Sequence, residues 1–199
     1  RTRYEKFYLN KPGLLSKYPP KEANSSISYG YDPNNPVPTI SATSALAELS
    51  LPEKKMDLSV DGLKEFMKPI FYDGGAHQKE YIGNFGSKAP YRLLSDRNDI
   101  LVFETEPLDK DIEITGEIKA FLWVGSSAKD TDFTLKIIDV YPANEDYLEG
   151  YHLAIADSVL RMRFRNGFGK EEMMSDSEIY QIQIKLPPIS NVFKINHHI

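Results

Sequence analysis

Cysteine is absent from the 199 residues of the chain. A disulfide and a thiolate metal site are therefore both excluded. A chain without cysteine fits the reducing cytoplasm, which is the compartment that we expect. Long apolar runs are also missing, because none approaches the roughly 18–20 residues that a membrane helix needs. We therefore expect no membrane partner.

An excess of positive charge is lacking as well. The chain has 24 Lys and Arg against 29 Asp and Glu, which gives a formal net charge of −5. Proteins that bind nucleic acids generally carry a basic face. The balance of charge therefore predicts no nucleic-acid partner.

The common catalytic and cofactor motifs are missing too. No G-x-S-x-G pentapeptide is present to carry a serine nucleophile, and Gly125–Ala128 lacks the final glycine. The four histidines form no H-E-x-x-H motif, and no phosphate-binding loop occurs. His197 and His198 lie at the end of the chain, where we expect fraying. The sequence predicts no catalytic residue, no metal and no cofactor.

What is present is alternation typical of β-strands. Apolar side chains occupy one parity over 112–124, 160–164 and 180–186, and Phe133–Tyr141 is apolar on both faces. Such a period of two places one parity in a core. The 12 Tyr, 10 Phe and 13 Pro favour strands and turns. The pattern predicts a mostly β protein, a sandwich or a jelly roll.

Residues 41–88 depart from this pattern. Val60, Leu63 and Met67 have helical spacing, and Pro69 would end such a helix. The stretch 73–87 holds four glycines and predicts a long loop.

Two acidic residues, Asp130 and Asp132, stand two positions apart. They have the spacing of a general acid/base pair or a cation site. The alternative is a structural pairing with Arg161 and Arg163, which we favour. The arginine row would suit a carboxylate or phosphate ligand, but a solvated strand face is the simpler interpretation.

Five stretches carry a resemblance to a known family. They are Tyr29–Thr39, Asp96–Leu108 with Ile114–Gly116, Ser126–Thr134 with Asp139–Pro142, Leu160–Arg165, and Ser190–Phe193. In this order they resemble the C-terminal domain of cocaine esterase, α-amino-acid ester hydrolases, glutaryl-cephalosporin acylase-like proteins and X-Pro dipeptidyl-peptidases. The resemblance covers residues 1–40 and 90–199.

The resemblance implies one jelly-roll, galactose-binding-like β-sandwich domain over 1–199, with an insert at about 41–88. In the family this domain packs on an N-terminal α/β-hydrolase domain, which holds the Ser-Asp-His triad and is missing from this chain. We therefore expect an inactive accessory domain of a serine hydrolase that acts on acyl esters, amides or X-Pro peptides.

Departures from the family pattern affect the insert and the C-terminus. The insert is longer than the family's short glycine-rich loop. The family continues into a further core strand. An unpaired sheet edge at that place favours association, so the sequence leaves a homo-oligomer open.

The resemblance places the insert near the mouth of the catalytic pocket. We expect Phe71, Tyr72 and the 73–87 loop with His77 to line the substrate pocket, because aromatic side chains suit an apolar cleft. An interdomain or oligomer contact is the equal alternative. A separate carbohydrate-binding module, with Trp123, Tyr141 or Tyr151 stacking on a sugar, is the second interpretation, and a structural assembly domain is the third.

Overall fold

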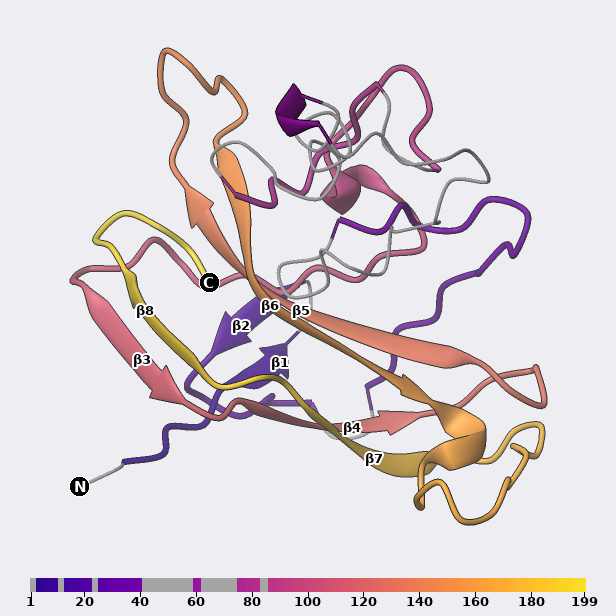
Figure 1. Cartoon of the computed structure of the whole chain (residues 1–199). Coiled ribbons are helices and arrows are strands. Elements are labelled where there is room, and N and C mark those ends of the chain that lie inside the picture. Colours follow the sequence, from indigo (N-terminus) through magenta and orange to yellow (C-terminus); the bar gives the residue numbers. More distant parts are fainter. Residues whose placement is uncertain (1–2, 11–12, 23–24, 41–58, 62–74, 83–85) are drawn as a thin grey trace. The chain divides into compact units, whose positions relative to one another are not determined.

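Strands and irregular connections make up most of the protein (Figure 1). The computed structural model describes residues 3–10, 13–22, 25–40, 59–61, 75–82 and 86–199. The elements are β1 Tyr8–Asn10, β2 Leu14–Ser16, the 3-10 turn η1 Leu94–Asp96, β3 Ile112–Gly116, β4 Lys119–Val124, β5 Asp132–Tyr141, β6 Tyr151–Arg161, the 3-10 turn η2 Met162–Phe164, β7 Tyr180–Lys185 and β8 Ile189–Phe193. The mostly β prediction is confirmed. The predicted helix after Ser59 lies largely outside the described residues.

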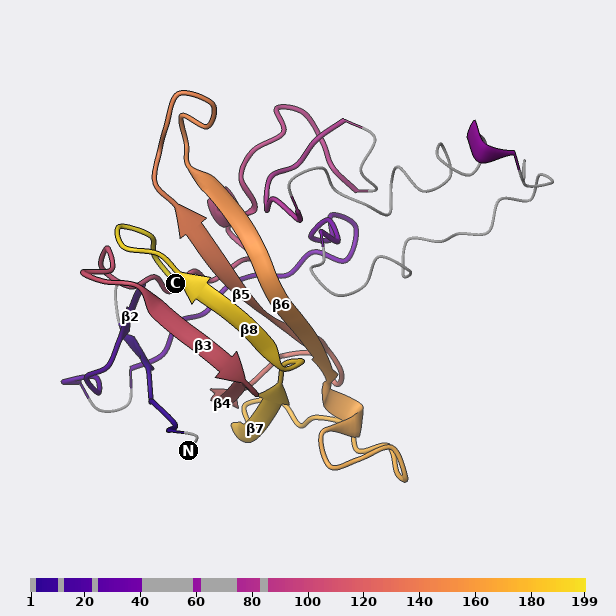
Figure 2. The same ribbon diagram turned by 60° about the vertical axis from the view of Figure 1, so that its left-hand side comes forward.

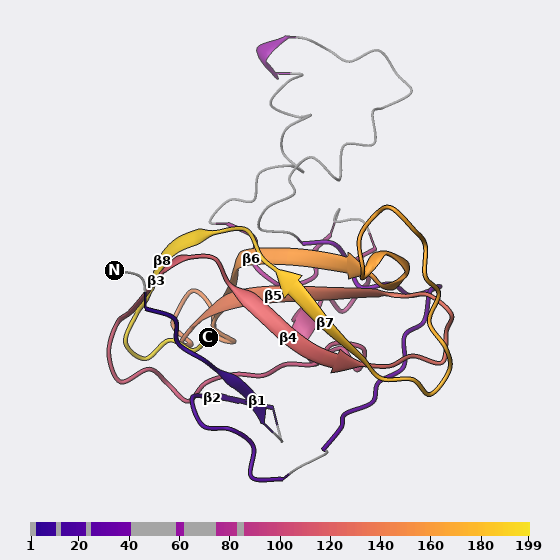
Figure 3. The ribbon, with the colours of Figure 1, turned by 90° about the horizontal axis from the view of Figure 1, so that it is seen from below.

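The strands pair two by two. β1 pairs with β2, β3 with β8, β4 with β7, and β5 with β6. Figure 2 shows β3 beside β8, and Figure 3 shows β4 beside β7. Chain contacts divide the protein into two compact units, which we describe separately. The first contains 1–112, 139–154 and 193–199, and the second contains 113–138 and 155–192.

The second unit has its core beneath the β4–β7 pair. The two strands are antiparallel, with Leu122 opposite Ile182 and Trp123 opposite Gln181. Buried Met162, Met174, Ile182 and Ile184 form the centre of the core, and Leu122, Val124, Phe133, Leu135, Leu160 and Tyr180 pack around it. The predicted inward parity is confirmed in both strands, because the positions predicted to face the core are less exposed than the alternate ones.

The first unit is built around loops that are tied to short strands. Ile40, Leu94 and Phe193 are among its buried apolar residues. The amide of the buried Gln78 donates to the carbonyls of Ile40, at 2.8 Å, and Ala76, at 3.0 Å. These bonds compensate the cost of burying a polar side chain. They also hold the end of the 73–87 stretch in place.

One predicted strand is shorter than the sequence indicates. The alternation of Leu160, Met162 and Phe164 predicts a strand through Phe164, but β6 ends at Arg161 and η2 follows. The Met162 N–H donates to the Thr131 carbonyl, and the Arg165 N–H turns back to the Met162 carbonyl. Met162 is still fully buried. The inward position is therefore kept by a turn rather than by a strand.

Candidate functional site

His77 is the candidate pocket residue that the structure describes, since Phe71 and Tyr72 lie outside the described residues. The segment around it runs alongside the first residues of β6. His77 forms a bridge with Leu153, and the Gln78 N–H donates to the His152 carbonyl at 2.8 Å. At Gly75 the φ angle is +93°, and a Cβ would lie 2.6 Å from Leu153 Cδ1. The positive φ angle favours glycine, and a Cβ would in addition displace the tip of the Leu153 side chain.

The imidazole of His77 is held by its neighbours. Its ring stacks on Tyr151 with a centroid separation of 4.2 Å and an angle of 13°. Its Nδ1 accepts the His152 N–H at 3.1 Å, which places the proton of a neutral ring on Nε2. Burial lowers the pKa of His77 below its usual value, against the opposing effect of the His152 backbone. The ring of His77 is therefore fixed by Tyr151 and His152, and its lowered pKa favours the neutral form.

Three tyrosines near His77 line an open cavity of about 240 Å³. We call it the tyrosine pocket, and its lining residues are Tyr141, Asn144, Tyr147, Tyr151 and Leu153. The ring planes of Tyr141 and Tyr147 stand at 88° and 68° to that of Tyr151. The Tyr151 hydroxyl donates to the Gly75 carbonyl at 3.1 Å. The pocket is thus anchored to the segment that carries His77.

Sequence reasoning identifies only part of this pocket. Tyr141 and Tyr151 were considered as sugar-stacking residues, whereas Tyr147 and Asn144 were missed. Tyr141 ends β5, Tyr151 begins β6, and Asn144 and Tyr147 lie in the turn between them, so the spacing of aromatic residues around one hairpin is the indication that the sequence offers.

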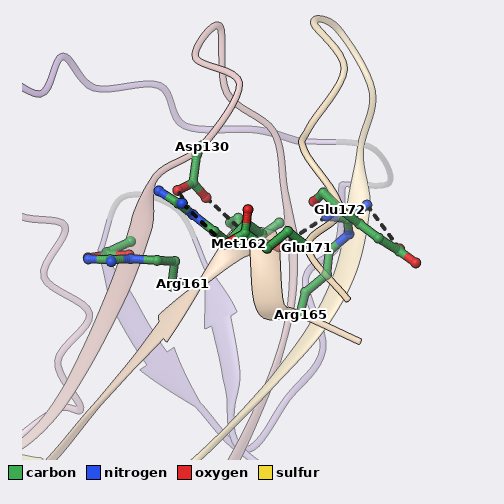
Figure 4. A network of polar contacts seen from close by, with 8 residues as sticks. Asp130, Arg161, Met162, Arg165, Glu171 and Glu172 are labelled. Carbon is green, nitrogen blue, oxygen red and sulfur yellow. Dashed lines mark hydrogen bonds and ion pairs between the residues drawn. The ribbon is translucent and has the colours of Figure 1, made fainter. Parts of the chain in front are cut away.

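The aspartate and arginine candidates are brought together as ion pairs. Figure 4 shows Asp130 and Arg161 among the polar residues of this region. Arg161 donates to both oxygens of Asp132, at 2.8 and 2.9 Å. Asp130 accepts the backbone N–H of Arg163 at 2.9 Å and its Nε at 2.6 Å. The hydrogen bond from Arg161 is the main cause of a lowered pKa at Asp132. Each carboxylate faces a guanidinium, which gives these residues a structural arrangement.

The C-terminal histidines do not fray. The His197 ring is buried, and its Nδ1 lies 2.8 Å from Oδ1 of Asp139, which is 2 % exposed. His198 exchanges two backbone hydrogen bonds with Val140, both of 3.0 Å. The prediction of a loose end is wrong, because these long-range bonds hold it. Within the described ranges no group of three or more His, Asp or Glu could hold a metal ion.

Trp123 and Phe121 lie on the outward parity of β4. Their exposed fractions are 67 % and 57 %, while the neighbouring Leu122 and Val124 pack inward. Gln181 and Gln183 stand opposite them on β7. Both rings therefore lie on the face of β4 that is turned away from the core.

Comparison with known proteins gives one family over the entire length. The profile of the X-Pro dipeptidyl-peptidase C-terminal non-catalytic domain matches residues 1–199. The chain belongs to this family. The resemblance that we identified in the sequence is therefore confirmed.

Individual relatives of this X-Pro dipeptidyl-peptidase C-terminal domain are larger proteins. Cocaine esterase of Rhodococcus sp. (strain MB1 Bresler) is 30 % identical over 206 residues, a match that covers 100 % of this chain and 29 % of the esterase. An aminopeptidase structure from a marine sediment Thaumarchaeota archaeon has a TM-score of 0.70 and 25 % identity, with 96 % of this chain and 27 % of the aminopeptidase covered.

A third relative shares the fold. An α-amino acid ester hydrolase structure has a TM-score of 0.66 and 24 % identity, over 98 % of this chain and 27 % of the hydrolase. The X-Pro dipeptidyl-peptidase C-terminal domain thus spans less than a third of each of these proteins. In its own described ranges, no helix has the length and hydropathy of a membrane span.

Proposed function

We propose that this chain is the accessory domain of a serine hydrolase and packs on an α/β-hydrolase catalytic domain. The exposed pair Phe121 and Trp123 carries the proposal, because a domain that leaves two large rings of one sheet face in solvent is suited to a partner surface. The family description as a C-terminal non-catalytic domain supports the same role. Substrates of such a hydrolase would be acyl esters, amides or X-Pro peptides, in line with the names of the relatives.

The proposal includes the architecture that the family resemblance implies. The chain would form one jelly-roll, galactose-binding-like sandwich over 1–199, with an insert at about 41–88. The pairing of antiparallel β4 and β7 over a shared core supports a sandwich layer.

Packing on the catalytic domain can be followed at Trp123, which is the single tryptophan of the chain. The chain is labelled with 5-fluorotryptophan and titrated with the unlabelled catalytic domain of its hydrolase. We expect the ¹⁹F resonance to shift and to lose its sensitivity to D₂O as the ring leaves water. A saturated complex with an unchanged resonance would rule out this face as the contact.

Two matched variants test whether the β4 face contributes to the affinity for the catalytic domain. Phe121→Ser should weaken the complex about tenfold or more, because a buried aromatic ring is a typical interface hot spot. Val159→Ser removes an exposed apolar side chain of β6 and should change the affinity by less than about twofold. Equal losses in both variants would contradict a contact centred on β4.

We further propose that Phe71, Tyr72 and the loop with His77 help to shape the substrate pocket of that catalytic domain. The stacking of His77 on Tyr151 supports this, because it fixes the position of His77 within the loop. Deletion of 73–87 from the complete enzyme should change the specificity constants for a series of esters by different factors. Unchanged ratios would leave the loop with an interdomain or oligomer role.

A carbohydrate-binding module is the second candidate, and the exposure of Trp123 beside two glutamines favours it. Stacking of a sugar ring on Trp123 would shift the same ¹⁹F resonance without any catalytic domain. A panel of mono- and oligosaccharides that leaves the resonance in place would eliminate this candidate.

A further inference from the structure

The tyrosine pocket has the properties of a cation site. Its rings belong to Tyr141, Tyr147 and Tyr151, whose planes are not parallel to one another. The face of an aromatic ring is negative, and a cation within about 6 Å of its centroid is attracted to it. His77 stacks on one face of Tyr151, and the His197 ring lies 4.2 Å from that of Tyr141, so a cation in the cavity would use the ring faces that these contacts leave open.

The hairpin that carries the pocket is acidic. Residues 139–155 contain Asp139, Glu145, Asp146 and Glu149, and no Lys or Arg. Lys79 pairs with Glu149 at 2.5 Å, so this carboxylate is compensated. No ion pair of Glu145 or Asp146 occurs with another residue of the described part. The hairpin therefore carries an excess of negative charge, which favours cations over carboxylates and phosphates.

The pocket is also held in shape before any ligand arrives. Oδ1 of Asn144 accepts the backbone N–H groups of Asp146 and Tyr147, each at 2.9 Å. The Tyr147 carbonyl accepts the N–H groups of Asn144 and Gly150, each at 3.0 Å. This closed turn fixes the backbone of Tyr147, whose side chain is 44 % exposed. Preorganisation of this kind reduces the entropy lost on binding.

The acceptor chemistry of the pocket selects among cations. The oxygen of Asn144 is already occupied by two backbone donors. No carboxylate is among the residues that line the cavity. A metal ion or a primary ammonium would lose water without gaining a carboxylate partner, whereas a quaternary ammonium has no N–H to satisfy. We propose that the tyrosine pocket binds the quaternary ammonium group of a small molecule.

A pair of isosteric ligands tests the proposal on the unaltered chain. Choline and 3,3-dimethyl-1-butanol have nearly the same shape, but only choline is charged. Saturation-transfer NMR should show contact with the N-methyl protons of choline, and titration of the ¹⁵N-labelled chain should give its affinity. We expect the neutral alcohol to bind at least about threefold more weakly, as expected for a cation held by ring faces.

Two substitutions at one position locate the site. Tyr147→Leu should weaken choline binding about fivefold, because it removes a ring, whereas Tyr147→Phe should stay within about twofold. The amide spectra of both variants check their folding. If Tyr147→Leu does not fold, the comparison of the two ligands still decides the question.

Three results would overturn the proposal. An alcohol that binds as tightly as choline would show an apolar cavity, and an absence of saturation transfer to choline would show no site. An unchanged affinity in folded Tyr147→Leu would place choline elsewhere. None of these results depends on the packing of the chain on a catalytic domain. The choline proposal can therefore be wrong while the accessory-domain proposal is right, and the reverse.

Discussion

Two aspartates that differ by two positions make contacts of different strength. Asp130 accepts a backbone N–H as well as a guanidinium, and its side chain is 18 % exposed. Asp132 makes a bidentate pair with Arg161, but it is 40 % exposed. Exposed ion pairs contribute little because water screens them. The aspartate that also fixes the backbone should matter more.

We therefore expect Asp130→Ala to lower the free energy of unfolding by about 1–3 kcal/mol, since it leaves the Arg163 N–H without its partner. Asp132→Ala is the matched control and should cost about 0–1 kcal/mol. Urea unfolding of the two variants and the parent measures both values. Equal costs would show that the backbone contact of Asp130 contributes nothing.

Lys136 is a second residue whose environment determines its chemistry. It lies in the interior of β5, and burial lowers its pKa from the usual 10.5 to about 8, against the opposing charge of Asp157. Between these two values the unfolded chain binds more protons than the folded chain. The free energy of unfolding therefore rises with pH across this window.

We expect the unfolding free energy of the parent to increase relative to that of Lys136→Met as the pH rises from 7 to 10. The increase should be up to about 3 kcal/mol. The comparison with the variant removes the contribution of the tyrosines, which titrate in both proteins. Denaturant unfolding at several pH values measures it. A difference that is constant with pH would contradict a depressed pKa at Lys136.

At the scale of elements, the hairpin between β5 and β6 depends on its glycine. Gly150 has a φ angle of +75°, and a Cβ there would press into the carbonyl oxygen of Tyr141. We expect Gly150→Ala to destabilise the protein by about 1–3 kcal/mol. Gly169→Ala serves as the control in thermal and urea unfolding, because a Cβ at Gly169 meets open space. A small cost at Gly150 would mean that the hairpin can rearrange.

The elements also show what can be predicted from the sequence and what cannot. The strands β4 and β7 were predictable because their core-facing apolar residues recur at every second position. The end of β6 was not, since the alternation continues through Phe164 while contacts with Thr131 and Glu172 turn the backbone. The order of the C-terminus was missed for the same reason, because the Asp139 partner of His197 is 58 residues away.

The candidate site was predictable to a smaller degree. His77 was selected for its glycine-rich surroundings, but its contacts with Tyr151 and His152 arise from pairing between segments 75 residues apart. A local sequence pattern carries no information about such pairing. The pairing of Asp132 with Arg161 joins two neighbouring strands, whereas Asp130 and Arg163 lie just outside β5 and β6, where charge alternation alone does not fix the contact.

At the scale of the whole molecule, the proposed role assigns catalysis to a domain other than this one. As a member of a non-catalytic domain family, the chain should not hydrolyse p-nitrophenyl acetate, and a fluorophosphonate probe should label none of its serines. Adding the catalytic domain should restore both signals. Turnover by this chain alone, with one labelled serine, would reveal an active site within it.

The alternation along β4 also has an evolutionary consequence. Leu122 and Val124 face the core, so substitutions there should reduce fitness in any assay that requires a folded protein. Phe121 and Trp123 face away from it, so variation there should be neutral in an assay of folding and deleterious where the partner is required. A six-residue strand would thus be subject to two separate selective pressures, one on each face.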